Sequence, residues 1–323
     1  MKTLLSTLLL VVLLTSCNTN KQGITLVESS GRMNSLIIIA DNDLWKGAVG
    51  DTLREIIVNP VLGLPQDEPQ FSIVQVSPDK FGKLFDNSRN LLFINLGDKT
   101  GYGLRKNVYA EPQLAMTISG KDEGALMSEI KKHESDIINV FKEADLKLYT
   151  NRLTKDHLDT DRFKTMKQLD FTLFIPKNYI MIDDTGDFIW FRQNIQKGSM
   201  NIIAYELPLP STDSIVKGIV PARDTIGKRY IPGQLEGTYM ITESAFTPFT
   251  IKTELDGKTA YETRGTWEVK GDFMAGPFLN YTVVDTAHNR LLVVEGFTFA
   301  PSADKRDYMF ELESILKTLK IRS

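Results

Sequence analysis

Five acidic residues near the C-terminus could carry acid–base chemistry if folding brings two of them together. They fall in predicted strands or in the loops between them, and they are Glu262, Glu268, Asp272, Asp285 and Glu295. A glycoside hydrolase needs only two carboxyl groups at the correct separation, one of them with a raised pKa. Spacing along the chain does not fix that separation, so the sequence leaves carboxylate chemistry open.

Glu295 has the most unusual surroundings of these acids, because Val294 and Gly296 flank it within an apolar run. If its side chain faces the core, we expect a raised pKa or an arginine partner, for which Arg264 is the obvious candidate. The alternative is that Glu295 points outward in an alternating strand. We favour the outward orientation, because antiparallel sheets usually have one solvated face.

Residues 264–278 indicate a second kind of chemistry, the binding of a ligand or partner. The segment combines aromatic and charged side chains with three glycines, in a loop longer than a tight hairpin requires. Tryptophan and arginine often anchor interfaces, and long loops often carry function. The structural alternative is that the aromatic rings pack on the sheet while the glycines shape a turn. The predicted binding surface consists of Arg264, Trp267, Asp272, Phe273 and Glu295.

Metal and nucleophile chemistry have little support in the sequence. There are three histidines, and His133 is followed by Glu134. However, Ile137 occupies the position where a zincin motif requires its second histidine. No Gly-x-Ser-x-Gly elbow and no phosphate-binding glycine spacing occurs. We therefore expect no metal, no cofactor and no catalytic residue.

The single cysteine, Cys17, could instead be a site of lipid attachment. Lys2 precedes an apolar run over residues 4–14, and small residues lead from that run to the cysteine. This layout is that of a secretory signal peptide, since a spanning helix needs about 20 apolar residues. Residues 14–17, Leu-Thr-Ser-Cys, also resemble the bacterial lipobox. The resemblance implies that the thiol receives a diacylglyceryl group and that cleavage makes Cys17 the N-terminus. The alternative is ordinary secretory cleavage beside an incidental cysteine.

The residues after Cys17 bear on where a lipidated chain would be placed. Lipoprotein sorting often depends on the residue after the cysteine, and Asn18 in place of aspartate favours the outer membrane. Residues 18–22 contain no acidic cluster of the kind that some lineages use for export to the cell surface. We therefore expect an outer-membrane lipoprotein facing the periplasm, with the lipid on Cys17 as its membrane contact.

Composition narrows the classes of partner. Hydrophobic residues make up 42% of the 323 residues and charged residues 24%, which is ordinary for a globular protein. The formal charge is -3, and loss of Lys2 with the signal peptide makes it one unit more negative. This balance argues against nucleic acid and against an anionic membrane patch as partners. The predicted lipid anchor instead indicates an envelope protein as the partner.

Hydrophobic periodicity divides the chain into two parts. Strands and helices alternate in the first part, from the β-branched strand at 36–39 to a long helix with an apolar stripe between Leu126 and Leu148. Hairpins dominate the second part, including one around Asp256-Gly257. The predicted fold is α+β with two domains: an N-terminal mixed α/β sandwich, ferredoxin-like in topology, and a C-terminal antiparallel sheet flanked by helices. The expected boundaries are 1–16 signal peptide, 17–34 lipidated tether, 35–150 first domain, 151–167 linker and 168–323 second domain.

Three stretches together resemble an uncharacterised lipoprotein family of Gram-negative bacteria, described as a domain of unknown function. They are residues 43–50, residues 63–69, and residues 263–267 with 271–278. The resemblance covers nearly the whole mature chain but implies no established activity. Residues 169–321 also resemble PsbP-type domains, through a strand ending in Phe-Ile-Pro, later hairpins and a C-terminal helix. That likeness implies an antiparallel sheet flanked by helices, in a fold used largely by accessory and binding proteins.

From these observations we expect a membrane-anchored lipoprotein that is a non-enzymatic binding or accessory module of the cell envelope. Two alternatives stay open. A carboxylate-dependent glycan hydrolase would show two acids facing each other in a cleft. A small-ligand carrier would show an apolar pocket between the domains.

Overall fold

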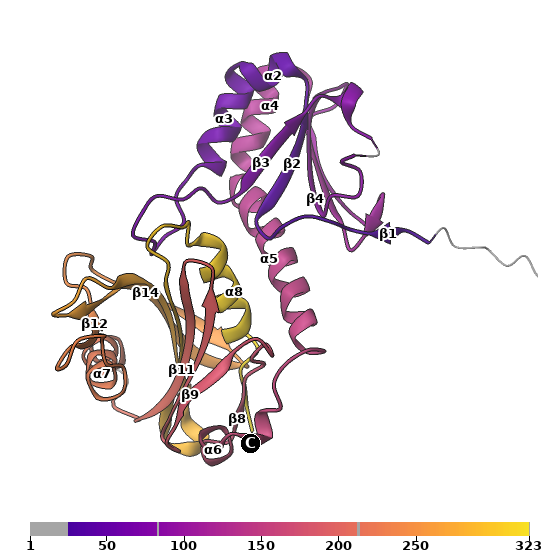
Figure 1. The fold of residues 1–323 in the computed structure, drawn as a ribbon. Coiled ribbons are helices and arrows are strands. Elements are labelled where there is room, and N and C mark those ends of the chain that lie inside the picture. The colour runs from indigo at the N-terminus through magenta and orange to yellow at the C-terminus, as the bar shows by residue number, and fades with distance from the viewer. Residues whose placement is uncertain (1–24, 83, 212–213, 323) are drawn as a thin grey trace, which may run out of the picture.

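The computed structural model describes residues 25–82, 84–211 and 214–322, and these contain two large sheets of different kinds and two short two-stranded sheets (Figure 1). Cys17, the signal peptide and most of the expected tether lie outside the described residues. The N-terminal part contains β1 (Val27–Glu28), β2 (Ser35–Ala40), α2 (Asn42–Lys46), α3 (Ala48–Ile57), β3 (Ser72–Val76), β4 (Asn90–Leu96), β5 (Gly101–Lys106), β6 (Ala110–Glu111), β7 (Leu114–Gly120), α4 (Glu123–Lys132) and α5 (Glu134–Leu153).

The N-terminal sheet is mostly parallel. Its strand order is β3-β2-β4-β7-β5, in which only β5 runs antiparallel to its neighbour. The β-branched run around Ile37 is buried on both faces, as expected of a central parallel strand. Leu36 and Ile38 face α3, α4 and α5, whereas Ile37 and Ile39 pack with Phe81 and Phe85 on the other side.

The expected ferredoxin-like topology is therefore not the one observed. In a βαββαβ unit a helix follows the first and the third strand. Here α2 and α3 join β2 to β3, but the next helix of the order is α4, after β7. The order of strands in a sheet is not visible in hydrophobic periodicity, which reports only the type of each element.

The predicted long helix is two helices, α4 and α5, that meet at His133. Leu126, Ile130, Ile137 and Phe141 of the predicted stripe are all fully buried. The His133 ring stacks on a tyrosine ring at 4.1 Å and contacts acids three residues on and four residues back. Its place at the helix junction explains why an imidazole interrupts the apolar stripe.

The C-terminal part is built on a curled eight-stranded antiparallel sheet with the path β12-β14-β15-β16-β11-β10-β9, on which β13 also pairs with β14. In Figure 1, α8 covers one face of this sheet and α7 the other. The elements are α6 (Lys164–Gln168), β8 (Phe171–Thr172), β9 (Ile180–Asp184), β10 (Phe188–Ile195), β11 (Gly198–Pro208), α7 (Ile215–Tyr230), β12 (Tyr239–Thr242), β13 (Phe249–Leu255), β14 (Lys258–Lys270), β15 (Ala275–Asp285), β16 (Arg290–Phe299), α8 (Arg306–Leu316) and β17 (Lys320–Ile321).

The Asp-Gly hairpin predicted from the sequence is present between β13 and β14. Asp256 and Gly257 both have positive φ, at 53° and 69°, and Leu255 pairs with Lys258 across the turn. Two positive φ angles are what a type I′ hairpin turn requires, and Asp-Gly adopts them at low cost. This local signal therefore fixed both the position and the register of the hairpin.

Residues 151–167, expected to be a linker, contribute side chains to the C-terminal core. Leu153, Phe163 and Met166 are each at most 5% exposed and belong to the cluster under α8. Phe163 packs edge-on against Phe191 of β10, with ring centroids 4.9 Å apart. The segment is thus a packed connection. Within the described residues, no helix is long and apolar enough to cross a membrane.

Candidate functional site

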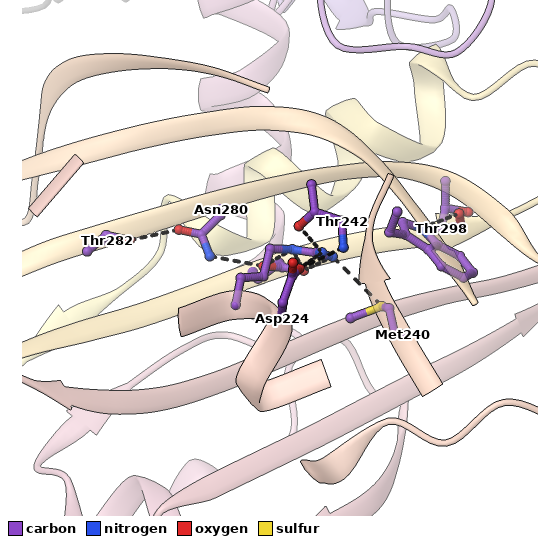
Figure 2. Close-up of polar contacts among 9 residues, drawn as sticks. Asp224, Met240, Thr242, Asn280, Thr282 and Thr298 are labelled. Atoms are coloured by element: carbon purple, nitrogen blue, oxygen red, sulfur yellow. Dashed lines mark hydrogen bonds and ion pairs between the residues drawn. The ribbon is translucent and has the colours of Figure 1, made fainter. Parts of the chain in front are cut away.

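Glu295 lies at the centre of β16 and is completely buried on the α7 face of the sheet. Arg223 of α7 donates from Nε to both carboxylate oxygens at 3.0 Å and from Nη2 to Oε1 at 2.8 Å. Asn280 of β15 donates a further hydrogen bond to Oε2 at 2.9 Å (Figure 2). The expectation of an outward-facing Glu295 was wrong, because helices and loops cover both faces of this sheet.

The network continues from Arg223 into its surroundings. Its Nη1 donates to the Thr242 hydroxyl at 3.0 Å, and its guanidinium lies 3.9 Å from the Phe278 ring centroid. Asp224 accepts the backbone N–H of Thr242 at 2.7 Å, so α7 is joined to β12 as well (Figure 2). Every oxygen of Glu295 has a partner, so the arrangement holds α7 against the sheet and leaves no lone pair aimed at a substrate.

The sequence places Arg223 on the sheet side of α7 by helical spacing. Ile215, Ile219, Arg223 and Gly227 recur every four residues and are all buried. A Cβ atom at Gly227 would lie 2.3 Å from the backbone oxygen of Met240, so only glycine permits this approach of α7 to β12.

Arg264 does not pair with Glu295, because it lies on the opposite, α8 face of the sheet. It donates from Nε to Glu262 at 2.6 Å and from Nη2 to Glu313 of α8 at 2.8 Å. Burial alone would raise the pKa of Glu313, but the positive charges of Arg264 and Lys317 hold that pKa at about 2. Glu313 is therefore a charged partner of Arg264 at neutral pH.

The five residues of the predicted binding surface do not form one surface. Trp267 shares the α7 face with Glu295, is 3% exposed and donates to the backbone oxygen of Thr298 at 3.3 Å. Asp272 and Phe273 form the tip of the β14–β15 hairpin, where the Phe273 side chain is fully exposed. Arg264 lies on the α8 face, opposite Trp267 and Glu295.

A cavity of about 430 Å³ lies beside Trp267 on the same face. Its walls are mainly aromatic and apolar, and exposed residues such as Asn194 and Gln234 stand at its rim. The volume falls within the range of small-molecule sites, ~300–1,000 Å³. The inner lining includes Trp190, Arg192, Asn201, Trp267, Phe297 and Phe299.

Arg192 is the charged residue of this cavity, and its position is fixed from two sides. Its guanidinium lies 4.7 Å from the Trp190 ring centroid, and its Nε donates to Asn201 Oδ1 at 3.1 Å. Asn201 also accepts the Trp190 indole N–H at 3.0 Å. Burial lowers the pKa of Arg192, and in the described chain no carboxylate forms an ion pair with it.

Sequence reasoning identified Trp267 but missed the other residues of the cavity. Trp190 and Arg192 are two residues apart in a strand and therefore share a face, as do Ser199 and Asn201 on β11. That period-two pattern was the sequence signal that could have shown which of these residues share a face. It could not show that β10, β11, β14 and β16 line one hollow.

The described chain has further cavities, but no cluster of metal ligands. No group of three or more potential metal ligands occurs among the described residues. A second cavity of about 430 Å³ lies between the two parts of the chain, where Arg264 is neutralised by Glu262 and Glu313. A third, of about 540 Å³, lies between β7 and α5.

Comparison with known protein families identifies the family to which this chain belongs. Residues 157–318, half of its length, match a domain of unknown function, DUF4837. The chain belongs to the DUF4837 family. Residues 29–154 of this DUF4837 protein match a second domain of unknown function, DUF8532. The expected membership of an uncharacterised family is thereby confirmed, whereas the PsbP-like likeness is not shown. No curated protein matches the chain.

Solved structures resemble about half of the DUF4837 chain at low identity. LpqN of Mycobacterium tuberculosis, involved in cell envelope biogenesis, is 13% identical, with 47% of this chain and 83% of LpqN covered and a TM-score of 0.31. The Saccharomyces cerevisiae Ran-binding protein Mog1p is 7% identical, with 47% and 90% covered and a TM-score of 0.34. Human StAR-related lipid transfer protein 5 is 8% identical, with 44% and 88% covered and a TM-score of 0.24.

Proposed function

We propose that this DUF4837 protein is a non-enzymatic binding module of the bacterial cell envelope, held at the outer membrane by lipid on Cys17, with its ligand site in the aromatic cavity. The observation that carries the proposal is the lining of that cavity. Trp190, Trp267 and Phe297 provide apolar walls, and Arg192 provides a charge that no carboxylate of the described residues neutralises. A concave apolar site with few polar groups is the usual form of a ligand pocket.

The same geometry argues against the carboxylate hydrolase. A glycosidase needs two acids facing a shared space. The cavity lining contains neither aspartate nor glutamate. Glu295 is occupied by Arg223 and Asn280, and Glu262 is occupied by Arg264 and the Tyr281 hydroxyl. The α7 face of the sheet therefore supports ligand binding better than glycoside hydrolysis.

The exposed hairpin tip supports contact with a partner or ligand at the rim. Phe273 is fully exposed, and its neighbour Met274 lines the cavity. An apolar side chain held out on a turn next to an aromatic hollow is positioned to contact whatever enters it.

Photo-crosslinking in bacterial cells tests the proposal. A benzophenone side chain is placed at Gln234, on the cavity rim, and in a matched strain at Val58, which is 56% exposed on the N-terminal part. We expect a reproducible adduct by mass spectrometry from position 234 and none from position 58. In the same cells, Cys17→Ala should move the chain from the membrane fraction to the soluble fraction.

Two results would contradict the proposal. Equal adducts at both positions, or none at 234, would remove the cavity as the binding site. Unchanged sedimentation of Cys17→Ala with membranes would remove the lipid anchor.

A further inference from the structure

Arg192 differs from the buried arginines of the described chain in having no anionic partner. Each buried arginine of the described chain forms an ion pair with a carboxylate, and the half-buried Arg264 forms two. A partly desolvated guanidinium without such a partner is costly, because burial disfavours the charged form. The paired buried arginines are Arg89, Arg223, Arg290 and Arg306.

The position of Arg192 is fixed although its charge is not compensated. Stacking on Trp190 and the Nε bond to Asn201 hold the plane of the guanidinium, and Asn201 is held in turn by the Ser199 hydroxyl at 3.1 Å. Among the residues that the structure describes, no hydrogen bond uses Nη1 or Nη2 of Arg192. A planar fork with its two terminal nitrogens free matches a carboxylate, sulfonate or phosphate group.

The walls of the cavity determine what such an anion can be attached to. Trp267 packs edge-on against Phe297, with centroids 5.5 Å apart, and lies 6.4 Å from Phe299. Met274 and Val269 extend the apolar surface. These walls favour an apolar or aromatic body and give no counter-charge to a cationic ligand.

We propose that the cavity takes an amphiphilic anion, whose acidic group binds to Arg192 and whose apolar or aromatic body packs against Trp267, Phe297 and Phe299. This inference rests on the proposed binding function of the same cavity. It adds the chemical class of the ligand and the residue that selects for it.

Two fluorescent dyes that share one skeleton test the charge requirement. The anionic probe is 8-anilinonaphthalene-1-sulfonate, and the neutral probe is N-phenyl-1-naphthylamine. They are titrated against the full chain carrying Cys17→Ser. We expect Arg192→Met to weaken binding of the anionic probe by ~10-fold or more, since hydrogen bonds to a charged group are lost. The Kd of the neutral probe should stay the same, and Arg192→Lys should recover part of the anionic binding.

Two further variants locate the effect. Arg105→Met removes an exposed arginine of β5, far from the cavity in sequence and sheet, and should change neither Kd. Met274→Trp fills the cavity and should weaken binding of both probes. Thermal unfolding of each variant, followed by circular dichroism, should match that of the parent chain.

The outcomes separate this inference from the proposed function. If both probes bind and Arg192→Met weakens them equally, or weakens neither, the anionic class is wrong while a binding cavity remains. If neither probe binds to the parent chain, or Met274→Trp leaves binding of both unchanged, the cavity is not a binding site and both proposals fail.

Discussion

At the scale of single residues, burying the Arg223–Glu295 ion pair costs free energy, and the pair has a specific geometry. Both side chains lie in the interior, at 1% and 0% exposure, so each charge depends on the other and on Asn280 and Thr242. Replacing a whole buried ion pair with apolar side chains is often neutral. Removing one member is costly because the other charge is left buried. The pair thus specifies where α7 docks.

We expect Arg223→Met to lower the free energy of unfolding by ~3–5 kcal/mol, because Glu295 then keeps an uncompensated buried charge. Urea unfolding of the Cys17→Ser chain measures it. The matched control is Arg229→Met, since Arg229 lies on the same helix with its side chain 65% exposed. That change should stay within ~0.5 kcal/mol.

The double variant Arg223→Met with Glu295→Met should lose less stability than Arg223→Met alone, because no charge remains buried. A single Arg223→Met variant as stable as Arg229→Met would show that the pair does not hold α7 in place.

The sequence could show that a core-facing Glu295 would need an arginine, but it could not show which one. Arg264 was the wrong choice because β14 presents even-numbered residues such as Ala260 to the α8 face, whereas β16 presents Glu295 to the other. Alternation says that two residues of one strand share a face. It does not relate the faces of strands whose pairing register is unknown.

At the scale of elements, the N-terminus of α8 is capped by a residue of the N-terminal part, in the loop between α3 and β3. Its own N-cap residue, Lys305, makes no side-chain cap. Instead the Glu68 carboxylate accepts the backbone N–H groups of Lys305 and Arg306, each at 2.7 Å. A negative charge at a helix N-terminus satisfies free N–H groups and interacts favourably with the helix dipole.

We expect Glu68→Ala to lower the free energy of unfolding by ~1–2 kcal/mol, the usual cost of losing a helix cap. Thermal and urea unfolding measure it. Asp67→Ala serves as the control, because Asp67 is an exposed acid one residue away. Glu68→Gln, which keeps an oxygen acceptor but not the charge, should fall between the two. Equal stability of the Glu68 and Asp67 variants would contradict the capping role.

Local signals predicted the elements well, and their assembly poorly. The Asp256-Gly257 hairpin, the β-branched strand at β2 and the apolar stripe of α4 and α5 all follow from residue type and period. The parallel order of the N-terminal sheet and the packing of residues 151–167 depend on long-range pairing. No local pattern records such pairing, which is why the aromatic cavity, lined by residues of six strands, was missed.

At the scale of the whole molecule, the two parts meet through polar side chains as well as the Glu68 cap. The Asn34 side chain donates to Asp307 at 3.0 Å across the two parts. Lys142 of α5, which donates to Gln70 within the N-terminal part, lines the cavity between the parts. Burial lowers the pKa of Lys142 to about 8, with Glu313 raising it and Arg264 and Arg306 lowering it further.

This shift gives a pH dependence of known sign. The pKa of Lys142 in the folded chain, about 8, is below the ordinary lysine value of 10.5. Between those values the unfolded chain binds more protons than the folded chain, so the free energy of unfolding rises with pH. We expect wild type to gain ~1–2 kcal/mol over Lys142→Met between pH 7.5 and 9.5, allowing for partial solvent exposure of the amine.

Urea unfolding of both proteins at the two pH values measures this difference, in which the titration of all other groups cancels. A constant difference between wild type and Lys142→Met across this range would mean that the amine is solvated and that the two parts do not enclose it.

Helix α5 joins the two matched sequence domains, because it contributes side chains to the hydrophobic cores of both parts. It is 20 residues long, or ~30 Å, with Phe141 in the N-terminal core and Leu153 in the C-terminal core. The border between the two family matches, from residue 154 to residue 157, falls just past its end. Recombination at that border would separate the C-terminal core from Leu153, which fills part of it. Moving either domain alone into another gene would therefore lower the stability of the fold. Descendants of this architecture should inherit the two modules together.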